Sequence, residues 1–356
     1  MHIGIVCKVI DNFGDAGFSL RLAKALAAKG HCVDLFHDEP ATFQALYPHS
    51  VNDNLRLIDA VKTNIETEYR QTPDLILEPF GTSSGQTACR FDLALKSRFP
   101  RTPWLLIDYL SCEKWIESFH LNTSTDPITG HVTTFFYPGF TDKTGGLIHC
   151  DYPARLAGKQ QSTNNTGLNV FVFAYPNAPI RKLIDLCNSI NTPEYAIKIG
   201  LAGNVLAPEL EDCAHQIPFV AQSEFDELLA QYDVLFVRGE DSFVRAQLAG
   251  KPFIWQIYPT EDNAHTEKLA CFYDVYASGL GADCRLALWN CWLAWNCIDT
   301  TVDFGKVWIN LLPHLPELQT HAIKWQAQLL DGRELVKEVL TWRGLQTPTL
   351  NEKPDL

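Results

Sequence analysis

Two carboxylates, Asp11 and Asp15, lie in a short glycine-bearing segment that ends at Gly17. The segment follows an apolar run, so both aspartates are expected at the carboxyl end of a buried strand, where the glycines let the backbone approach a ligand closely. One carboxylate could take a proton while the other positions a substrate. The alternative is that Asp11 or Asp15 only caps the following helix, and position alone leaves both explanations open.

A cation stands just before a predicted helix in the stretch Val237-Arg238-Gly239-Glu240-Asp241-Ser242. The first turn of a helix has unpaired backbone N–H groups, so together with Arg238 it could hold a diphosphate. Ser242 could donate its hydroxyl, whereas Glu240 and Asp241 could accept hydrogen bonds from sugar or ribose hydroxyls. The helix dipole alone would explain both acidic residues, but Arg238 is unfavourable there unless an anion is bound.

Gln256 and Tyr258 end the next predicted strand, immediately before Pro259. Because the carboxyl ends of neighbouring strands line one cleft in a doubly wound sheet, both side chains could bond phosphate or sugar oxygens. The alternative is a strand that Pro259 terminates and a solvated helix after it.

Aromatic residues also gather at predicted strand and helix ends. Phe173 and Tyr175 end one strand, Phe219 ends another, and Phe225 opens the following helix. Such rings could stack on a nucleotide base, and the Gln222 amide could hydrogen-bond the edge of that base. Each ring taken singly is more often part of a core than of a binding site.

Strands and helices alternate along the chain, which predicts an α/β protein with two doubly wound parallel sheets. The first series has expected strands at residues 3–10, 32–36, 74–80 and 104–110, with a helix at 18–28. The second series has expected strands at residues 168–175, 195–199, 217–221, 234–237 and 253–258, with helices at 180–190, 225–232 and 241–248. Residues 111–166 are weakly periodic and are expected to form loops and short helices, whereas 262–342 are expected to be mostly helical.

Two domains follow from this division and from the length of 356 residues. We expect an N-terminal Rossmann-like, acceptor-binding domain at residues 1–166, ending in the polar linker 160–167. A second Rossmann-like domain at residues 167–335 is expected to bind a nucleotide sugar, and residues 336–356 to pack back on the first domain.

Composition narrows the class of protein. The net charge of −13 and the lack of a basic run disfavour nucleic-acid binding. No apolar stretch approaches the length of a membrane helix and no leader peptide is evident, so we expect a cytoplasmic protein that binds no membrane. The 11 cysteines form no CxxC pair and are expected to be reduced thiols. No compact metal motif or dinucleotide fingerprint is present, so no metal or cofactor is expected.

The motifs together resemble the elongation factor P arginine rhamnosyltransferase (EarP) family. The resemblance rests on Asp11-Asn12-Phe13-Gly14-Asp15, residues 171–176, Arg238-Gly239-Glu240-Asp241-Ser242-Phe243 and Trp255-Gln256-Ile257-Tyr258-Pro259, and it covers essentially the whole chain. It implies the GT-B fold, with two facing Rossmann-like domains and a cleft between them. It also implies transfer of L-rhamnose, with inversion, from dTDP-β-L-rhamnose to an arginine side chain of elongation factor P.

The resemblance also implies residue roles. Asp15 would be the general base or guanidinium activator, Asp11 would position acceptor or sugar, and Glu240 would be a second-domain acidic residue needed for activity. The rest of the first motif, Asn12, Phe13 and Gly14, would contact substrate. A thymine pocket would comprise Phe173, Phe219, Gln222 and Phe225, with Tyr175 nearby, and the residues holding deoxyribose and diphosphate would be Arg238, Asp241, Ser242, Gln256 and Tyr258.

Three other functions share much of this pattern. Another GT-B transferase acting on a lipid or small glycan would need a basic or apolar patch on the first domain, which the sequence does not show. A nucleotide-sugar epimerase would need no protein acceptor. A non-catalytic nucleotide-binding regulator would have no use for the Asp11 and Asp15 pair.

Overall fold

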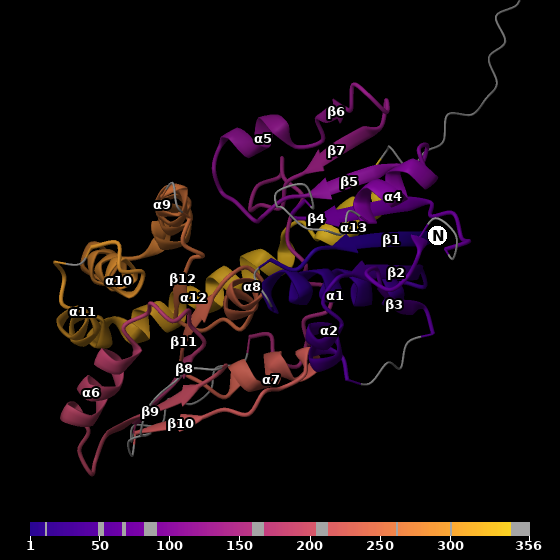
Figure 1. Ribbon diagram of the computed structural model, residues 1–356. Helices are drawn as coiled ribbons and strands as arrows, with labels where there is room; N and C mark the ends of the chain where they lie inside the picture. Colours follow the sequence, from indigo (N-terminus) through magenta and orange to yellow (C-terminus); the bar gives the residue numbers. More distant parts are fainter. Residues whose placement is uncertain are drawn as a thin grey trace, which may run out of the picture.

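The computed structural model contains two parallel β-sheets, each flanked by helices (Figure 1). It describes residues 1–10, 13–48, 53–65, 69–81, 91–158, 167–203, 213–260, 263–299 and 301–342. Both sheets have the doubly wound strand order, in which the chain runs outward in one direction and then restarts beside the first strand in the other. The predicted α/β class is therefore confirmed.

The first sheet has the order β3-β2-β1-β4-β5-β7-β6, in which only β6 runs antiparallel to its neighbour. Its strands are β1 (His2–Cys7), β2 (Cys32–His37), β3 (Leu55–Asp59), β4 (Leu75–Pro79), β5 (Trp104–Ile107), β6 (Thr123–Thr125) and β7 (Val132–Phe136). The accompanying helices are α1 (Phe13–Ala28), α2 (Pro40–Leu46), α4 (Phe91–Arg98) and α5 (Trp115–Phe119). The strands β1 and β4 are buried on both faces over nearly their whole length, as central parallel strands require, although β4 contains the charged residue Glu78.

The second sheet has the order β10-β9-β8-β11-β12, with all strands parallel. Its strands are β8 (Gly167–Val172), β9 (Ala196–Leu201), β10 (Ala214–Gln216), β11 (Val234–Arg238) and β12 (Phe253–Gln256). Helices α6 (Ile180–Ile190), α7 (Phe225–Ala230) and α8 (Asp241–Leu248) join them, with the short helix η1 (Gln222–Glu224) before α7. The helices predicted at 180–190 and 241–248 are confirmed to the residue.

The remainder is helical, as predicted. It comprises α9 (Ala264–Tyr276), η2 (Ala277–Gly279), α10 (Ala282–Trp295), α11 (Phe304–Leu311), η3 (Leu312–His314), α12 (Leu315–Asp331) and α13 (Leu335–Thr341). The last of these returns to the first sheet, where Leu335, Val336 and Val339 join the core that α1 and β1 form. Residues 343–356 lie outside the described part of the chain.

Three sequence predictions are wrong in detail. No strand forms at residues 217–221, because the strand pairing with β9 lies earlier, at β10. The segment 111–166 is not only loops and helices, since β7 within it pairs with β5 and extends the first sheet. The glycine-bearing loop is shorter than predicted, because α1 begins at Phe13 and contains Gly14 and Gly17. Tertiary packing there overrides the low helix propensity of glycine.

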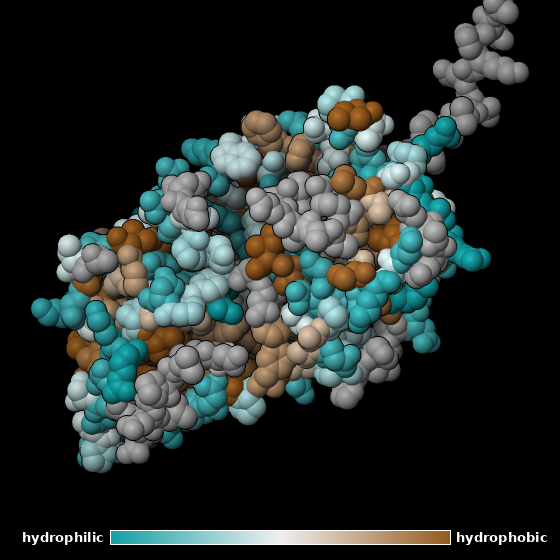
Figure 2. All heavy atoms as spheres, viewed as in Figure 1, coloured by the Kyte–Doolittle hydropathy of each residue, from teal (hydrophilic) through white to brown (hydrophobic). Residues whose placement is uncertain are grey.

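On the face shown in Figure 2, hydrophobic patches are separated from one another by hydrophilic residues. Within the described part of the chain, no helix combines the length and apolar character needed to cross a bilayer.

Candidate active site

Each doubly wound sheet has one point at which its strand order reverses, and these two points lie at the same interface. In open α/β sheets the crevice for a ligand lies beyond the carboxyl ends of the strands, where the strand order reverses. In the first sheet this point lies after β1 and β4, and in the second after β8 and β11. Helix α1, which follows β1, contacts α8, which follows β11, so the two crevices adjoin (Figure 1).

Asp15 lies in the first turn of α1 and is almost entirely buried, with 2% of its surface exposed. Its Oδ2 accepts a hydrogen bond from the backbone N–H of Ile10 at 2.7 Å, which fixes the carboxylate just beyond the end of β1. Phe13 and Gly14 are half-buried in the same turn. Asp11 and Asn12 lie outside the described residues, so the proposed carboxylate pair stays a prediction.

Arg238 ends β11 and is the cation that the sequence pattern singled out. Its guanidinium carbon lies 4.4 Å from the centre of the Phe173 ring and 4.5 Å from that of Tyr175, and Nη1 donates to the carbonyl of Ala174 at 3.4 Å. No carboxylate in the described part of the chain lies within ion-pair distance of it. Ser242 holds the turn closed, because its hydroxyl donates to the Arg238 carbonyl. A cation without a carboxylate partner among the described residues therefore lies beside the first turn of α8.

Gln256 serves chiefly to join the ends of β8 and β12. Its Oε1 accepts from the Tyr175 backbone N–H at 2.6 Å, and its Nε2 donates to Asn177 Oδ1 at 2.9 Å. Tyr258, in contrast, is 49% exposed, with its ring 5.5 Å from that of Tyr175. Of these two predicted ligand-binding side chains, Tyr258 is the one that remains accessible.

Two of the predicted base-binding residues, Phe219 and Gln222, contact the first domain. Phe219 is 56% exposed, and its ring centre is 5.2 Å from that of Phe13. Gln222 is buried and donates through Nε2 to the Gly17 carbonyl at 2.6 Å, whereas its Oε1 has no hydrogen-bond partner among the described residues. Phe225 is half-buried against the core ring of Phe171. Helix α1 therefore forms one side of the predicted base-binding site.

A pocket lies between the two domains and contains the acidic residues that precede and begin α8. It is lined by side chains of both domains, including Phe18, Phe80, Leu110, Glu240, Asp241 and Val244. Glu240 Oε1 accepts from Lys268 Nζ at 2.8 Å, and its Oε2 is buried with no hydrogen-bond partner in the described part of the chain. Asp241 is paired with Arg21 of α1 through bonds of 2.7 and 3.0 Å. Asp241 thus contacts the first domain, although the sequence predicted a donor contact for it.

Sequence reasoning missed several residues of this interface. Phe80, directly after β4, has a left-handed backbone conformation (φ 63°), and its ring stacks on Tyr109 with centres 4.3 Å apart. Strain of this kind in a non-glycine residue often marks a functional site. Arg21 could have been noticed as a charge on an otherwise apolar helical face, and Arg245 as a charge within the apolar stretch after Phe243.

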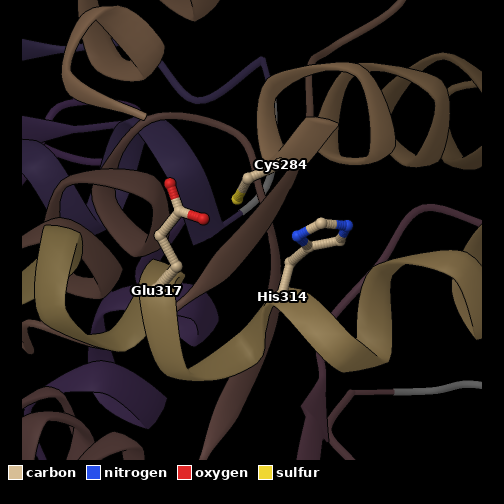
Figure 3. A group of neighbouring side chains, drawn as sticks. All are labelled: Cys284, His314 and Glu317. Carbon is tan, nitrogen blue, oxygen red and sulfur yellow. The ribbon is translucent and has the colours of Figure 1, made fainter. Parts of the chain in front are cut away.

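A separate cluster of metal-ligand side chain types lies on the outer helices of the second domain. Cys284 of α10, His314 of η3 and Glu317 of α12 point toward one another, with potential ligand atoms within 4.8 Å (Figure 3). Burial and the neighbouring Glu317 raise the pKa of the Cys284 thiol to about 12, so this sulfur is protonated at neutral pH. Glu317 also accepts from the Gly281 backbone N–H at 2.7 Å. None of the three lines the pocket between the domains.

Sequence comparison gives a family match over nearly the full chain. The model of the family described as Elongation-Factor P (EF-P) rhamnosyltransferase EarP matches residues 3–343. A protein-arginine rhamnosyltransferase of Pseudomonas putida is 34% identical over 360 residues, covering 91% of this chain and 93% of the relative. One from Shewanella oneidensis is 30% identical, covering 95% of this chain and 96% of the relative.

Solved structures give the same fold. One described as "Structural basis for EarP-mediated arginine glycosylation of translation elongation factor EF-P" has a TM-score of 0.56 and 25% identity, covering 95% of this chain and 97% of that one. The spinosyn rhamnosyltransferase SpnG, solved with thymidine diphosphate, has a TM-score of 0.57 over 96% of this chain and 99% of its own, at 14% identity. These similarities confirm the GT-B type of fold predicted from the sequence.

Proposed function

This chain belongs to the EarP family of protein-arginine rhamnosyltransferases, and we propose that it moves L-rhamnose from dTDP-β-L-rhamnose to one arginine of elongation factor P. The transfer inverts the anomeric centre and takes place in the cytoplasm. The guanidinium nitrogen forms a bond to the anomeric carbon, the bond from that carbon to the diphosphate oxygen breaks, and the guanidinium loses one proton.

The observation that supports this proposal is that a buried carboxylate and a cation follow corresponding strands of the two sheets, where the two crevices adjoin. A buried carboxylate, Asp15, lies beyond β1, and Arg238, a cation with no carboxylate partner in the described part of the chain, ends β11. A guanidinium is a poor nucleophile because it is nearly always protonated, so a carboxylate that orients it and accepts its proton lowers the barrier. A leaving diphosphate gains negative charge, which Arg238 and the first-turn N–H groups of α8 would stabilise.

Glu240 and Gln222 supply two further acceptors for the donor. Glu240 Oε2 and Gln222 Oε1 have no hydrogen-bond partner among the residues that the structure describes. The first could accept from a sugar hydroxyl and the second from the N–H of a thymine ring. A buried acceptor without a donor costs about 1–3 kcal/mol, so a ligand that supplies the missing hydrogen bond recovers that cost on binding. The similar fold of SpnG was solved with thymidine diphosphate bound, which favours the same nucleotide class here.

The test is intact-mass analysis of elongation factor P after incubation with this protein and dTDP-β-L-rhamnose. We expect a gain of one deoxyhexose. Conversion of the sugar nucleotide in the absence of acceptor would favour an epimerase. Transfer to a small glycan or lipid, with the protein acceptor unmodified, would favour another GT-B transferase.

Removing the Phe219 ring is expected to weaken dTDP binding about tenfold or more, since base–aromatic stacking contributes about 1–3 kcal/mol. Phe219 is exposed, so Phe219→Ala leaves the core intact. Calorimetric titration with dTDP measures the effect. Phe119→Ala is the matched control, because Phe119 of α5 is 50% exposed and lies in the other domain. An unchanged dissociation constant for Phe219→Ala would remove this ring from the base pocket.

Arg238→Ala is expected to impair donor use because it removes the cation next to the diphosphate, a loss of about 10²–10³-fold by analogy with other transition-state charge contacts. Initial rates over a range of dTDP-rhamnose concentrations measure this loss.

Activity of the unaltered protein should survive EDTA, since Arg238 and the N-terminus of α8 take the place of a metal. EDTA inhibition reversed by added magnesium or manganese would contradict this charge assignment.

A further inference from the structure

One face of helix α1 meets the second domain at residues that recur every four positions. Phe13 contacts the Phe219 ring, the Gly17 carbonyl accepts from Gln222, and Arg21 pairs with Asp241. Residues four apart lie above one another on a helix, so these three form a continuous stripe. Gly17 faces Asp241 directly, because a Cβ there would be in van der Waals contact with Asp241 Oδ2 at 3.4 Å.

Arg21 is the most strongly held residue of this stripe. Its Nε and Nη2 donate to the two oxygens of Asp241 at 2.7 and 3.0 Å, and its Nη1 donates to Asp151 at 2.6 Å. Arg21 is 3% exposed. Burial opposes its charge, but Asp241 and Asp151 more than compensate, so the pKa of Arg21 is raised and the group stays charged.

A second arginine, Arg245, bonds to the same carboxylate of Asp151 that Arg21 contacts. Arg245 of α8 donates to the second oxygen of Asp151 at 2.9 Å, and its Nε donates to Asp226 of α7 at 2.7 Å. Burial opposes the charge on Asp151, but the two guanidinium groups outweigh it and lower the pKa of that carboxyl. The network therefore ties α1 to α8 and α7 through a residue in the segment between the sheets.

We propose that Arg21 is a positioning residue that sets the distance between the acceptor-side and donor-side groups of the reaction. The inference rests on the proposed function. Asp15 lies in the same helix as Arg21, and Glu240 immediately precedes its partner, Asp241. The two hydrogen bonds between the Arg21 guanidinium and the Asp241 carboxylate fix α1 against α8, and therefore fix Asp15 relative to Glu240. A displacement of about 1 Å in such an arrangement can cost about 10²-fold in rate.

The test compares Arg21→Lys with Arg56→Lys. Lysine keeps the charge but cannot hold both oxygens of Asp241 and also reach Asp151. Arg56 is the matched control, since it makes the same two-pronged pair with Asp34, 2.6 Å at each prong, within the first domain. We expect kcat for rhamnose transfer to fall about 10²-fold in Arg21→Lys, with dTDP affinity unchanged. Arg56→Lys should retain kcat.

Two further measurements distinguish a positioning role of Arg21 from a general loss of stability. Melting temperatures of both variants show whether lost stability accounts for the loss of rate, and small-angle scattering of the ligand-free proteins should show a wider spread of the domains only in Arg21→Lys. Unchanged kcat in Arg21→Lys would overturn the proposal, as would a parallel loss of dTDP affinity, which would make Arg21 part of the donor site. Failure of the unaltered protein to modify elongation factor P would instead contradict the proposed function, and the scattering comparison would still test the domain contact.

Discussion

Asp15→Asn is expected to lose most of its turnover, about 10²–10⁴-fold, because it removes the group that orients and deprotonates the acceptor guanidinium. Asparagine retains an oxygen that can accept from the Ile10 N–H, so the start of α1 should survive the exchange. Donor affinity should stay nearly unchanged, because the predicted donor residues belong to the second domain. Initial rates at saturating donor and calorimetric titration with dTDP measure the two quantities separately.

Asp303→Asn provides the matched control for that variant. Asp303 is the N-cap of α11 and accepts from the Lys306 backbone N–H at 2.9 Å, a local contact similar to that of Asp15. Asparagine is an equally good N-cap, so this variant should keep full activity. If Asp15→Asn instead loses dTDP affinity in proportion to turnover, Asp15 is a donor-binding or structural residue, not a proton acceptor.

Replacing the modified arginine of elongation factor P by lysine is expected to abolish transfer altogether. An ammonium is a compact point charge and lacks the planar fork that a carboxylate can align with the anomeric carbon. An arginine on a protruding loop of a folded partner can reach such a buried site at small entropic cost, because the loop is already shaped. Intact-mass analysis followed by fragmentation should locate one deoxyhexose on a single arginine of the unaltered factor and none on the lysine variant.

A second arginine-to-lysine variant of the factor, at a surface position remote from the modified one, should accept rhamnose as well as the unaltered factor. Two results would contradict the acceptor assignment. One is modification of the lysine variant at the same position. The other is modification of the unaltered factor at many arginines, which would indicate a promiscuous transferase that does not recognise a particular protein surface.

Much of the fold was predictable because its determinants are local. The strands β1 and β11 are largely apolar runs, and α6 and α8 have helical spacing with clear stops, so their positions follow from periodicity. The failures have physical causes as well. The strand expected at 217–221 has the composition of a strand, but pairing with β9 takes place at β10 instead. Periodicity alone does not specify which residues find a partner.

The sequence by itself determined the two α/β series, the family, and the placing of Asp15 after the first strand and of Arg238 at the end of β11, because motif spacing and hydrophobic periodicity are short-range properties. Only the tertiary structure decided what Asp241 and Gln222 contact, since both bond to α1 of the other domain. Arg21 and Asp241 are separated by 220 positions, and no local pattern links them. Their pairing depends on how the two domains close on each other, and burial in that interface makes the charges attract strongly enough to hold it.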